Sequence, residues 1–210
     1  MKRRNRFSKT LNSTKRKANN HPAAERAKAV IRRNVMEEIG ASNARVFDAF
    51  AGEGVMYRQV WHEAAHYVGC DIVWYRDERP AFVGDNRRVL RAIDLSAFNV
   101  FDLDAYGAPW EQVMIIAARR QVAAGEKVGL ILTEGSGLNL KLGGISIALR
   151  SLAGVKKTFA GGARHQDALI DMALAGMCKR MGVILARRWN AKRKGGSSMH
   201  YIGLVLEGVS

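Results

Sequence analysis

Acidic residues follow four successive apolar segments of this sequence, and carboxylates in that position can bind a ligand at the edge of a parallel sheet. The residues are Asp48, Asp71, Asp85 followed by Asn86, and Asp102 with Asp104. In a sheet whose strands run the same way, the carboxyl ends of the strands meet at one edge, where ligands bind. The spacing therefore predicts that these side chains gather at one site.

The same residues suit an adenine nucleoside. Gly52 and Gly54 form a turn after the first apolar segment, and residues without a Cβ let the backbone approach a ligand closely. Asp71 ends the second segment, where an ionised carboxylate can accept hydrogen bonds from both hydroxyls of a ribose. Asp85 and Asn86 offer polar groups that can read the edge of an adenine. A single glycine turn is a weak sign, whereas the ordered series is a strong one.

The segment WHEAAHY contains a second candidate site, because His62, Glu63 and His66 have the HExxH spacing. On one face of a helix, two such histidines hold Zn²⁺ while the glutamate activates the bound water. We expect a helix over residues 55–66, whose far end lies away from the ligand edge. No third ligand follows in the HxxGxxH form. Chance spacing on a packing helix is therefore favoured over a zinc hydrolase, and no metal is predicted.

Apolar segments alternate with helical patterns along most of the chain. Strands are expected at residues 44–50, 67–74, 81–86, 98–104 and 127–135, and helices at 23–40, 55–66, 87–94, 109–125 and 166–181. The apolar stripe of the first helix is expected at Ala27, Val30, Ile31 and Val35. Two final strands, at 182–190 and 199–208, are joined too closely for a crossover and must pair antiparallel. The pattern predicts an α/β fold with a seven-stranded, mostly parallel sheet and helices on both faces.

With 210 residues, the chain suits one domain with an appendage. Residues 1–20 are expected to be a basic, disordered arm, and residues 21–210 a single domain. The glycine-rich segment at about 135–163 resists assignment, apart from a short helix expected at 145–152.

The formal net charge is +15, and residues 1–20 hold eight basic residues and no acidic one. Such a charge points to a polyanionic partner, for which nucleic acid is the first candidate and an anionic membrane surface the second. The arm can order on phosphates, or it can serve as a solubilising tail or a localisation signal. A basic turn with Lys192, Arg193 and Lys194 suits phosphate contact and plain solvation equally well.

No apolar run approaches the ~18 residues of a transmembrane helix, and the first residues are polar and basic, unlike a secretory signal. An intracellular, cytoplasmic location without membrane insertion is therefore expected. Cys70 and Cys178 lie far apart and form no CxxC pair, so neither a disulfide framework nor a thiolate zinc site is predicted.

Four motifs, VFDAFAGEG, GCDI, FVGDN and FDLDAYGAP, make residues 40–135 resemble the class I S-adenosylmethionine-dependent methyltransferases. The closing antiparallel pair is similar to the sixth and seventh strands of that Rossmann-like fold. The resemblance implies S-adenosylmethionine as cofactor, with its ribose at Asp71 next to Ile72 and its adenine at Asp85 and Asn86. The residues implied to cradle the methionine part are Asp48, Phe50, Ala51, Gly52 and Gly54. Asp102 either belongs to this cofactor edge or is a buried, paired acid.

The fourth motif, residues 104–109, bears on the substrate. It is DAYGAP, and it is most similar to the motif of the tRNA guanine-N2 dimethyltransferases, a variant of the Asp/Asn-Pro-Pro-Tyr/Phe motif of enzymes that methylate amino groups of bases. The resemblance implies that Asp104 accepts a hydrogen bond from an amino group while Tyr106 stacks on the base. Ala105 replaces the usual proline. The residues expected on the substrate side are Gly107, Pro109 and Trp110, and the pocket mouth is favoured over the core for both Tyr106 and Trp110.

The resemblance and the charge together imply a methyltransferase that acts on nucleic acid at a base nitrogen, with RNA slightly favoured over DNA. A catalytically inactive relative that only binds nucleic acid is the alternative, and an HExxH zinc hydrolase is less favoured. Other nucleotide-binding folds fit less well, because the chain has neither a GxxxxGK[ST] loop nor a full GxGxxG turn.

Overall fold

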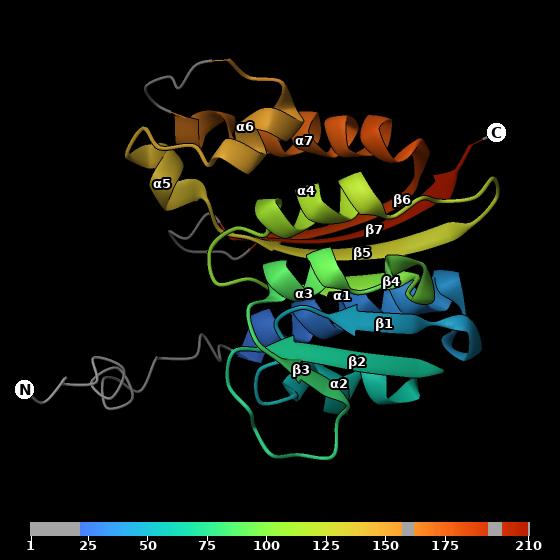
Figure 1. Cartoon of the computed structure of the whole chain (residues 1–210). Coiled ribbons are helices and arrows are strands. Elements are labelled where there is room, and N and C mark those ends of the chain that lie inside the picture. The colour runs from blue at the N-terminus through green and yellow to red at the C-terminus, as the bar shows by residue number, and fades with distance from the viewer. Residues whose placement is uncertain (1–21, 157–161, 193–198, 210) are drawn as a thin grey trace, which may run out of the picture.

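The computed structural model describes residues 22–156, 162–192 and 199–209. The basic arm and two of the predicted phosphate-contacting residues, Arg193 and Lys194, lie outside the described residues. Within them, the chain folds around one seven-stranded sheet with helices on both faces (Figure 1).

The sheet has the strand order β3-β2-β1-β4-β5-β7-β6. The strands are β1 (Arg45–Asp48), β2 (His66–Asp71), β3 (Ala81–Val83), β4 (Val100–Leu103), β5 (Lys127–Glu134), β6 (Val183–Lys192) and β7 (His200–Gly208). The first five strands run parallel, and β7 lies antiparallel between β5 and β6. The predicted fold, including the closing antiparallel pair, is confirmed. Its central strands are apolar almost throughout because both faces of the sheet are covered.

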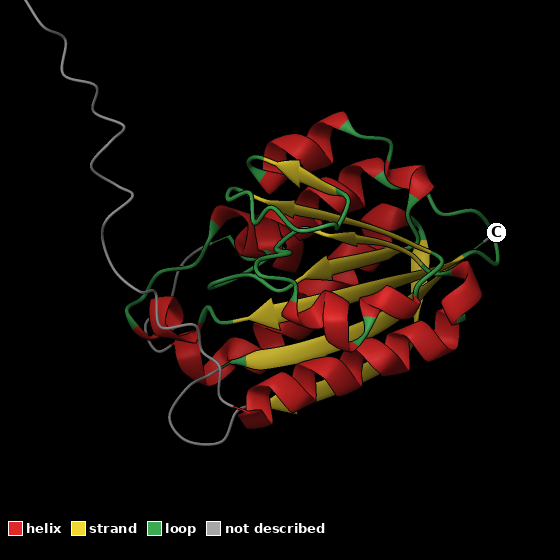
Figure 2. Cartoon of the chain, turned by 90° about the horizontal axis from the view of Figure 1, so that it is seen from below, coloured by secondary structure: helices red, strands yellow, loops and turns green. Residues whose placement is uncertain are grey.

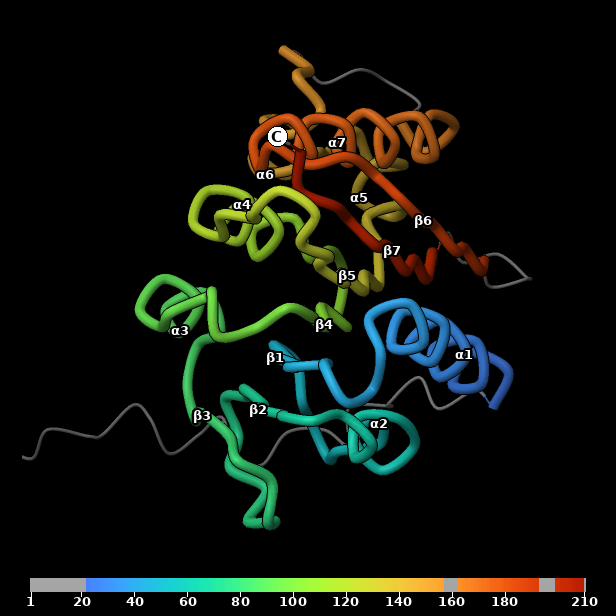
Figure 3. Tube along the Cα trace, turned by 90° about the vertical axis from the view of Figure 1, so that its right-hand side faces the viewer, coloured from blue at the N-terminus to red at the C-terminus, as the bar shows by residue number. Residues whose placement is uncertain are grey.

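The helices form two layers (Figures 2 and 3). One face of the sheet carries α1 (Pro22–Ile39) and α2 (Val55–Gln59), and the other carries α3 (Asn86–Ala92), α4 (Trp110–Arg119), α6 (Ile147–Ala153) and α7 (Gln166–Met181). Neighbouring strand residues face opposite layers, so that Val46 belongs to the apolar cluster under α1 and Phe47 to the cluster under α4. In the ranges that the structure describes, no helix is both long and apolar enough to cross a membrane.

Helix α1 lies close against β5 and β7 because two glycines leave the sheet flat beneath it. A Cβ at Gly129 would lie 2.6 Å from Cγ1 of Val35, and one at Gly203 would lie 2.7 Å from Cγ2 of Ile31. The predicted apolar stripe holds for Ile31 and Val35, which are buried, but Val30 is 51% exposed. The helix is therefore fixed to β5 and β7.

The helix expected over residues 55–66 is wrong in its second half. Helix α2 stops at Gln59, where Val60 takes φ −141° and ψ −59° and a 3₁₀ turn follows. His66 is the first residue of β2. His62 and His66 are therefore not one turn apart on a helix, and the HExxH spacing spans a turn and a strand rather than a packing helix.

The glycine-rich segment contains more helix than its composition indicates. The helix expected at 145–152 corresponds to α6. A further short helix, α5 (Gly137–Lys141), was not predicted and begins three residues after β5 ends. It therefore lies at the carboxyl edge of the sheet.

Candidate functional site

The glycine turn after β1 is tied to the end of β2. Gly52 and Gly54 have φ values of 45° and 75°, in the left-handed region that favours glycine. The N–H of Gly52 donates to Oδ2 of Asp71 at 3.0 Å, and the N–H of Val73 donates to Oδ1 of Asp71 at 3.0 Å. The Asp71 carboxylate thus holds the turn and stays at the carboxyl edge of the sheet, where it was predicted.

Arg79 also holds the turn, and the sequence reasoning missed it. Its Nη1 donates to the carbonyl oxygen of Ala51 at 3.0 Å and its Nη2 donates to that of Gly52 at 2.7 Å. A Cβ at Gly54 would lie 2.7 Å from its Cζ. Asp77 forms an ion pair with Arg79 at 2.5 Å. The charged link between β2 and β3 therefore shapes the glycine turn, although nothing in its sequence pattern indicates this.

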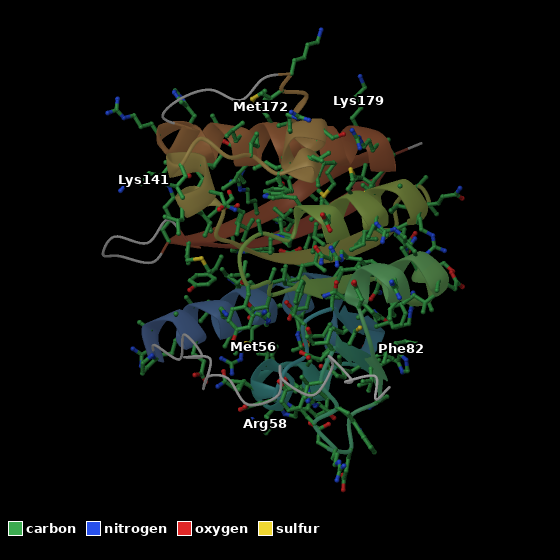
Figure 4. All side chains as sticks on the ribbon, turned by 60° about the vertical axis from the view of Figure 1, so that its left-hand side comes forward. Met56, Arg58, Phe82, Lys141, Met172 and Lys179 are labelled. Carbon is green, nitrogen blue, oxygen red and sulfur yellow. The ribbon has the colours of Figure 1, made fainter. Side chains whose placement is uncertain are left out.

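A hollow opens beside the turn at the carboxyl ends of β1 to β3. Its walls include Asp71 and the apolar or aromatic side chains of Val73, Trp74, Tyr75, Phe82 and Val83. The label of Phe82 in Figure 4 marks one wall of this hollow. Two predicted contacts lie elsewhere: Ile72 is 68% exposed and does not line the hollow, and Phe50 packs against the core. The hollow therefore offers the Asp71 carboxylate beside apolar and aromatic surfaces, and the ion-paired side chains of Asp77 and Arg79 also line it.

Asp85 and Asn86 reach the same edge, but the chain itself uses their polar groups. Asp85 caps α3 by accepting from the N–H of Arg87, and its ion pair with the Arg87 guanidinium holds the pKa of Asp85 at about 2. Asn86 donates to the carbonyl oxygen of Ala49 at 2.7 Å and accepts from Gln112 at 2.9 Å. Both residues therefore organise the start of α3.

Asp102 is fully buried and paired, so it does not face the hollow. Arg32 of α1 donates to it twice, from Nε at 2.6 Å and from Nη2 at 2.7 Å. The indole N–H of Trp61 donates to the same carboxylate at 2.7 Å. The second interpretation of Asp102, a buried paired acid, is the one that the structure supports.

Asp104 is also engaged by α1. Nζ of Lys28 lies 2.7 and 2.8 Å from its two oxygens, and Nη2 of Arg32 lies 3.2 Å from Oδ2. Burial alone would raise the pKa of Asp104, but Arg32 and Lys28 outweigh burial and hold the pKa below its usual value, with a hydrogen bond from Thr133 acting in the same direction. The carboxylate is therefore ionised, and Lys28, Arg32 and Thr133 together make four contacts with its roughly four acceptor positions.

Asp48 is buried beneath the glycine turn. It accepts hydrogen bonds from the N–H of Phe50 at 3.0 Å and from the hydroxyl of Tyr67 at 3.1 Å. Burial raises its pKa to about 8, and the nearby Asp102 carboxylate adds to the increase, although Arg32 opposes it. Burial therefore favours the neutral form of Asp48 beneath the turn.

Of the aromatic residues in the fourth motif, one is exposed and the other is buried. Tyr106 is 75% exposed beside Gly107, whose φ is 102°. Pro109 immediately precedes α4. Trp110, predicted at the pocket mouth, is only 1% exposed and donates to Glu134 at 3.3 Å, because the first turn of α4 packs on the core. Of the two rings in this motif, only that of Tyr106 is exposed to an incoming ligand.

Of the three predicted phosphate-contacting residues, Lys192 is the one that the structure describes, and its Nζ lies 2.5 Å from Oδ2 of Asp167. In the part of the chain that the structure describes, no three His, Cys, Asp or Glu side chains are placed to hold a metal ion.

No protein-family model matches the sequence, and no curated protein matches it either. Several solved structures do. A complex of Trm1 from Pyrococcus horikoshii with S-adenosyl-L-methionine has a TM-score of 0.56 and 13% identity, over 90% of this chain and 56% of the Trm1 chain. N-methyltransferase NodS from Bradyrhizobium japonicum, in complex with S-adenosyl-L-homocysteine, has a TM-score of 0.54 and 7% identity, over 88% of this chain and 87% of the other.

The 1,6-didemethyltoxoflavin-N1-methyltransferase of Burkholderia thailandensis has a TM-score of 0.51 and 15% identity, over 91% of this chain and 82% of the other. This chain has the class I methyltransferase fold. At these identities the likeness is one of fold. The chain also spans little more than half of the Trm1 chain, 56% of its length.

Proposed function

We propose that the protein is an S-adenosylmethionine-dependent methyltransferase that acts on nucleic acid at a base nitrogen, with RNA favoured over DNA. The observation that carries the proposal is the contact between Asp71 and the glycine turn at the ligand edge of a methyltransferase fold. A carboxylate and a Cβ-free turn held together in this way suit a ribose and the chain attached to it.

The residues at this edge fit the cofactor. The Asp71 carboxylate accepts hydrogen bonds from two backbone N–H groups. About two of its acceptor positions are therefore left for ribose hydroxyls. The apolar walls around Trp74 and Phe82 suit a flat adenine. When bound, S-adenosylmethionine supplies a methyl group on a cationic sulfonium. Residues 45–134 carry ten basic and thirteen acidic side chains, and this net charge of −3 favours a cation.

On the acceptor side, the exposed ring of Tyr106 can stack on a base, which orients the base beside the cofactor edge. In this proposal Asp104 acts mainly as a positioning residue, because Lys28 and Arg32 already occupy its carboxylate. The ion pairs hold the fourth motif against α1, so that Tyr106 projects from a fixed backbone.

A protein that binds nucleic acid without methylating it is the second candidate. The saturation of Asp104 favours it, since no acceptor position of that carboxylate is left for the amino group of a base. Ala105, where the related motif has proline, points the same way.

Calorimetry with S-adenosylhomocysteine tests the cofactor part of the proposal. We expect the wild type to bind, and Asp71→Ala to weaken binding by roughly 10- to 100-fold, because a hydrogen bond to a charged group contributes about 1.5–3 kcal/mol. Asp94→Ala is the matched control, since Asp94 is an exposed carboxylate that caps a 3₁₀ turn elsewhere. Failure of the wild type to bind would sink the proposal.

Mass spectrometry of RNA and DNA from cells that express the protein tests the acceptor part. We expect a methylated base with the wild type that is absent with Tyr106→Ala, a change at an exposed site that leaves the fold intact. Binding of nucleic acid without any modified base would favour the second candidate.

A further inference from the structure

The two segments of the chain that meet at the candidate site differ in net charge. The β1–β4 side belongs to the region of net charge −3. Beyond it, the described residues from 135 to 192 hold nine basic and only two acidic side chains, Asp167 and Asp171, for a net charge of +7. A cationic cofactor and a polyanionic acceptor would therefore be drawn to different halves of one edge.

Basic residues of the second segment lie at the carboxyl edge of the sheet. Register pairing places Lys192 opposite His200, and His200 opposite Glu134 at the end of β5. The ion pair between Lys192 and Asp167 connects the end of β6 to the first turn of α7. Arg164 precedes that turn by two residues.

Helix α5 extends this surface toward the end of β5. A Cβ at Gly162 would lie 3.3 Å from the carbonyl oxygen of Leu140, so the turn that carries Arg164 lies against α5. Lys141 is the last residue of α5 and lies at this end of the molecule (Figure 4). Among the described residues, Lys141 and Arg164 are exposed and have no acidic partner, and Lys192 is 58% exposed.

We infer that Lys141, Arg164 and Lys192 form a docking surface for the phosphates of single-stranded RNA, along which the strand is led to Tyr106. The inference rests on the proposed function, in which the acceptor is a nucleic acid. Single-stranded RNA presents phosphates together with unstacked bases. This surface offers cations together with the exposed apolar side chains of Leu138 and Leu142. The N–H of Gly135, between β5 and α5, donates to the carbonyl oxygen of Gly107, which joins this surface to the loop that carries the exposed Tyr106.

A titration of labelled single-stranded RNA against salt concentration tests the inference on the full chain. The edge variant carries Lys141→Ala, Arg164→Ala and Lys192→Ala. The control variant carries Arg91→Ala, Lys127→Ala and Lys179→Ala, which removes the same charge from exposed positions away from this surface. Lys179, on α7, lies well apart from Lys141 (Figure 4).

We expect the edge variant to bind the RNA at least about tenfold more weakly near 0.1 M salt, with a log–log salt slope shallower by about 2, since each lost contact with single-stranded nucleic acid removes about 0.7 from that slope. The control variant is expected to bind like the wild type. Equal losses in the two variants, or no RNA binding by the wild type, would overturn the inference.

Two further measurements distinguish RNA from other polyanionic partners, and the docking surface from the proposed methyltransferase function. The first measurement replaces the RNA with duplex DNA, or with vesicles of phosphatidylserine and phosphatidylcholine. If the wild type binds one of these instead of the RNA, and the edge substitutions abolish that binding, the inference is overturned. Calorimetry with S-adenosylhomocysteine should give the same affinity for the wild type and the edge variant. Absence of that binding in the wild type would remove the proposed methyltransferase function, while the RNA titration would still decide the docking surface.

Discussion

The carboxylates at the strand ends fall into two groups that differ in what holds them. The inner carboxylates are Asp48, Asp102 and Asp104, which are buried or nearly buried and lie toward α1. The outer carboxylates are Asp71 and Asp85, which hold backbone N–H groups at the rim. Although the sequence spacing treats all five alike, only an outer carboxylate is available to a ligand. Burial and nearby cations, rather than position after a strand, decide the role of each.

The inner group should be the most sensitive to loss of its cation. We expect Arg32→Met to lower the free energy of unfolding by about 3–5 kcal/mol, because it leaves Asp102 buried without a counter-charge. Urea denaturation followed by circular dichroism measures this. Arg33→Met, at an exposed position of the same helix, should cost about 0.5 kcal/mol or less.

A double variant sharpens that result. Adding Asp102→Asn to Arg32→Met removes the unpaired charge while an amide oxygen still accepts from the indole of Trp61. We expect the double variant to recover part of the lost stability, as coupled neighbours do. If the two losses simply added, the charge pairing would not be the cause.

The two outer carboxylates should differ in cofactor affinity. We expect Asp71→Asn to weaken binding of S-adenosylhomocysteine by roughly tenfold, because an amide can accept only at one of its two terminal atoms. Asp85→Asn should change that affinity by less than about twofold, since the Asp85 carboxylate already pairs with Arg87. Calorimetry on both variants measures the difference, and equal losses would contradict the division between them.

Asp48 should make stability depend on pH. Its folded pKa of about 8 lies above the ordinary value, so the folded state binds the proton more tightly than the unfolded state. That contribution is complete below pH ~4 and is lost as pH rises toward 8. Asp48→Asn should therefore flatten the decline in unfolding free energy between pH 5 and 8, measured by urea denaturation. A variant with the wild-type slope would show that another group titrates.

The smallest effect is expected at the cap of α3. Asp85→Ala removes the acceptor for the N–H of Arg87 and should cost about 0.5–1 kcal/mol. Asp85→Asn retains an acceptor and should lower the free energy of unfolding by only about 0.3 kcal/mol. Thermal unfolding of the two variants side by side resolves the difference, and equal midpoints would rule out capping as the role of this carboxylate.

The elements were largely predictable from the sequence because strands buried on both faces and glycine turns leave local patterns. The bounds of α7 match the expected helix at 166–181. The second half of the helix expected at 55–66 failed because Val60 breaks it and His66 pairs in the sheet, both of which depend on tertiary context. The five residues of α5 were too few to show a helical period.

The candidate site was predictable only in part. The strand-end position of Asp71 was correct, yet nothing local indicates which acids a distant helix will neutralise. One signal was available: Lys28 and Arg32 are spaced one turn apart on the stripe that contains Ile31 and Val35. A charge on a buried stripe indicates a buried partner, and four acidic strand ends were the candidates.

The close seat of α1 on Gly129 and Gly203 also constrains how the chain is made. Helix α1 precedes the other described elements in the chain, yet it packs on β7, the last of them. Until that strand is in place, Ile31 lacks the backbone surface at Gly203 on which it packs. Such a long-range contact slows folding and leaves apolar surface exposed during synthesis. Helix α1 can therefore complete its packing only after the strands that follow it in the chain have formed.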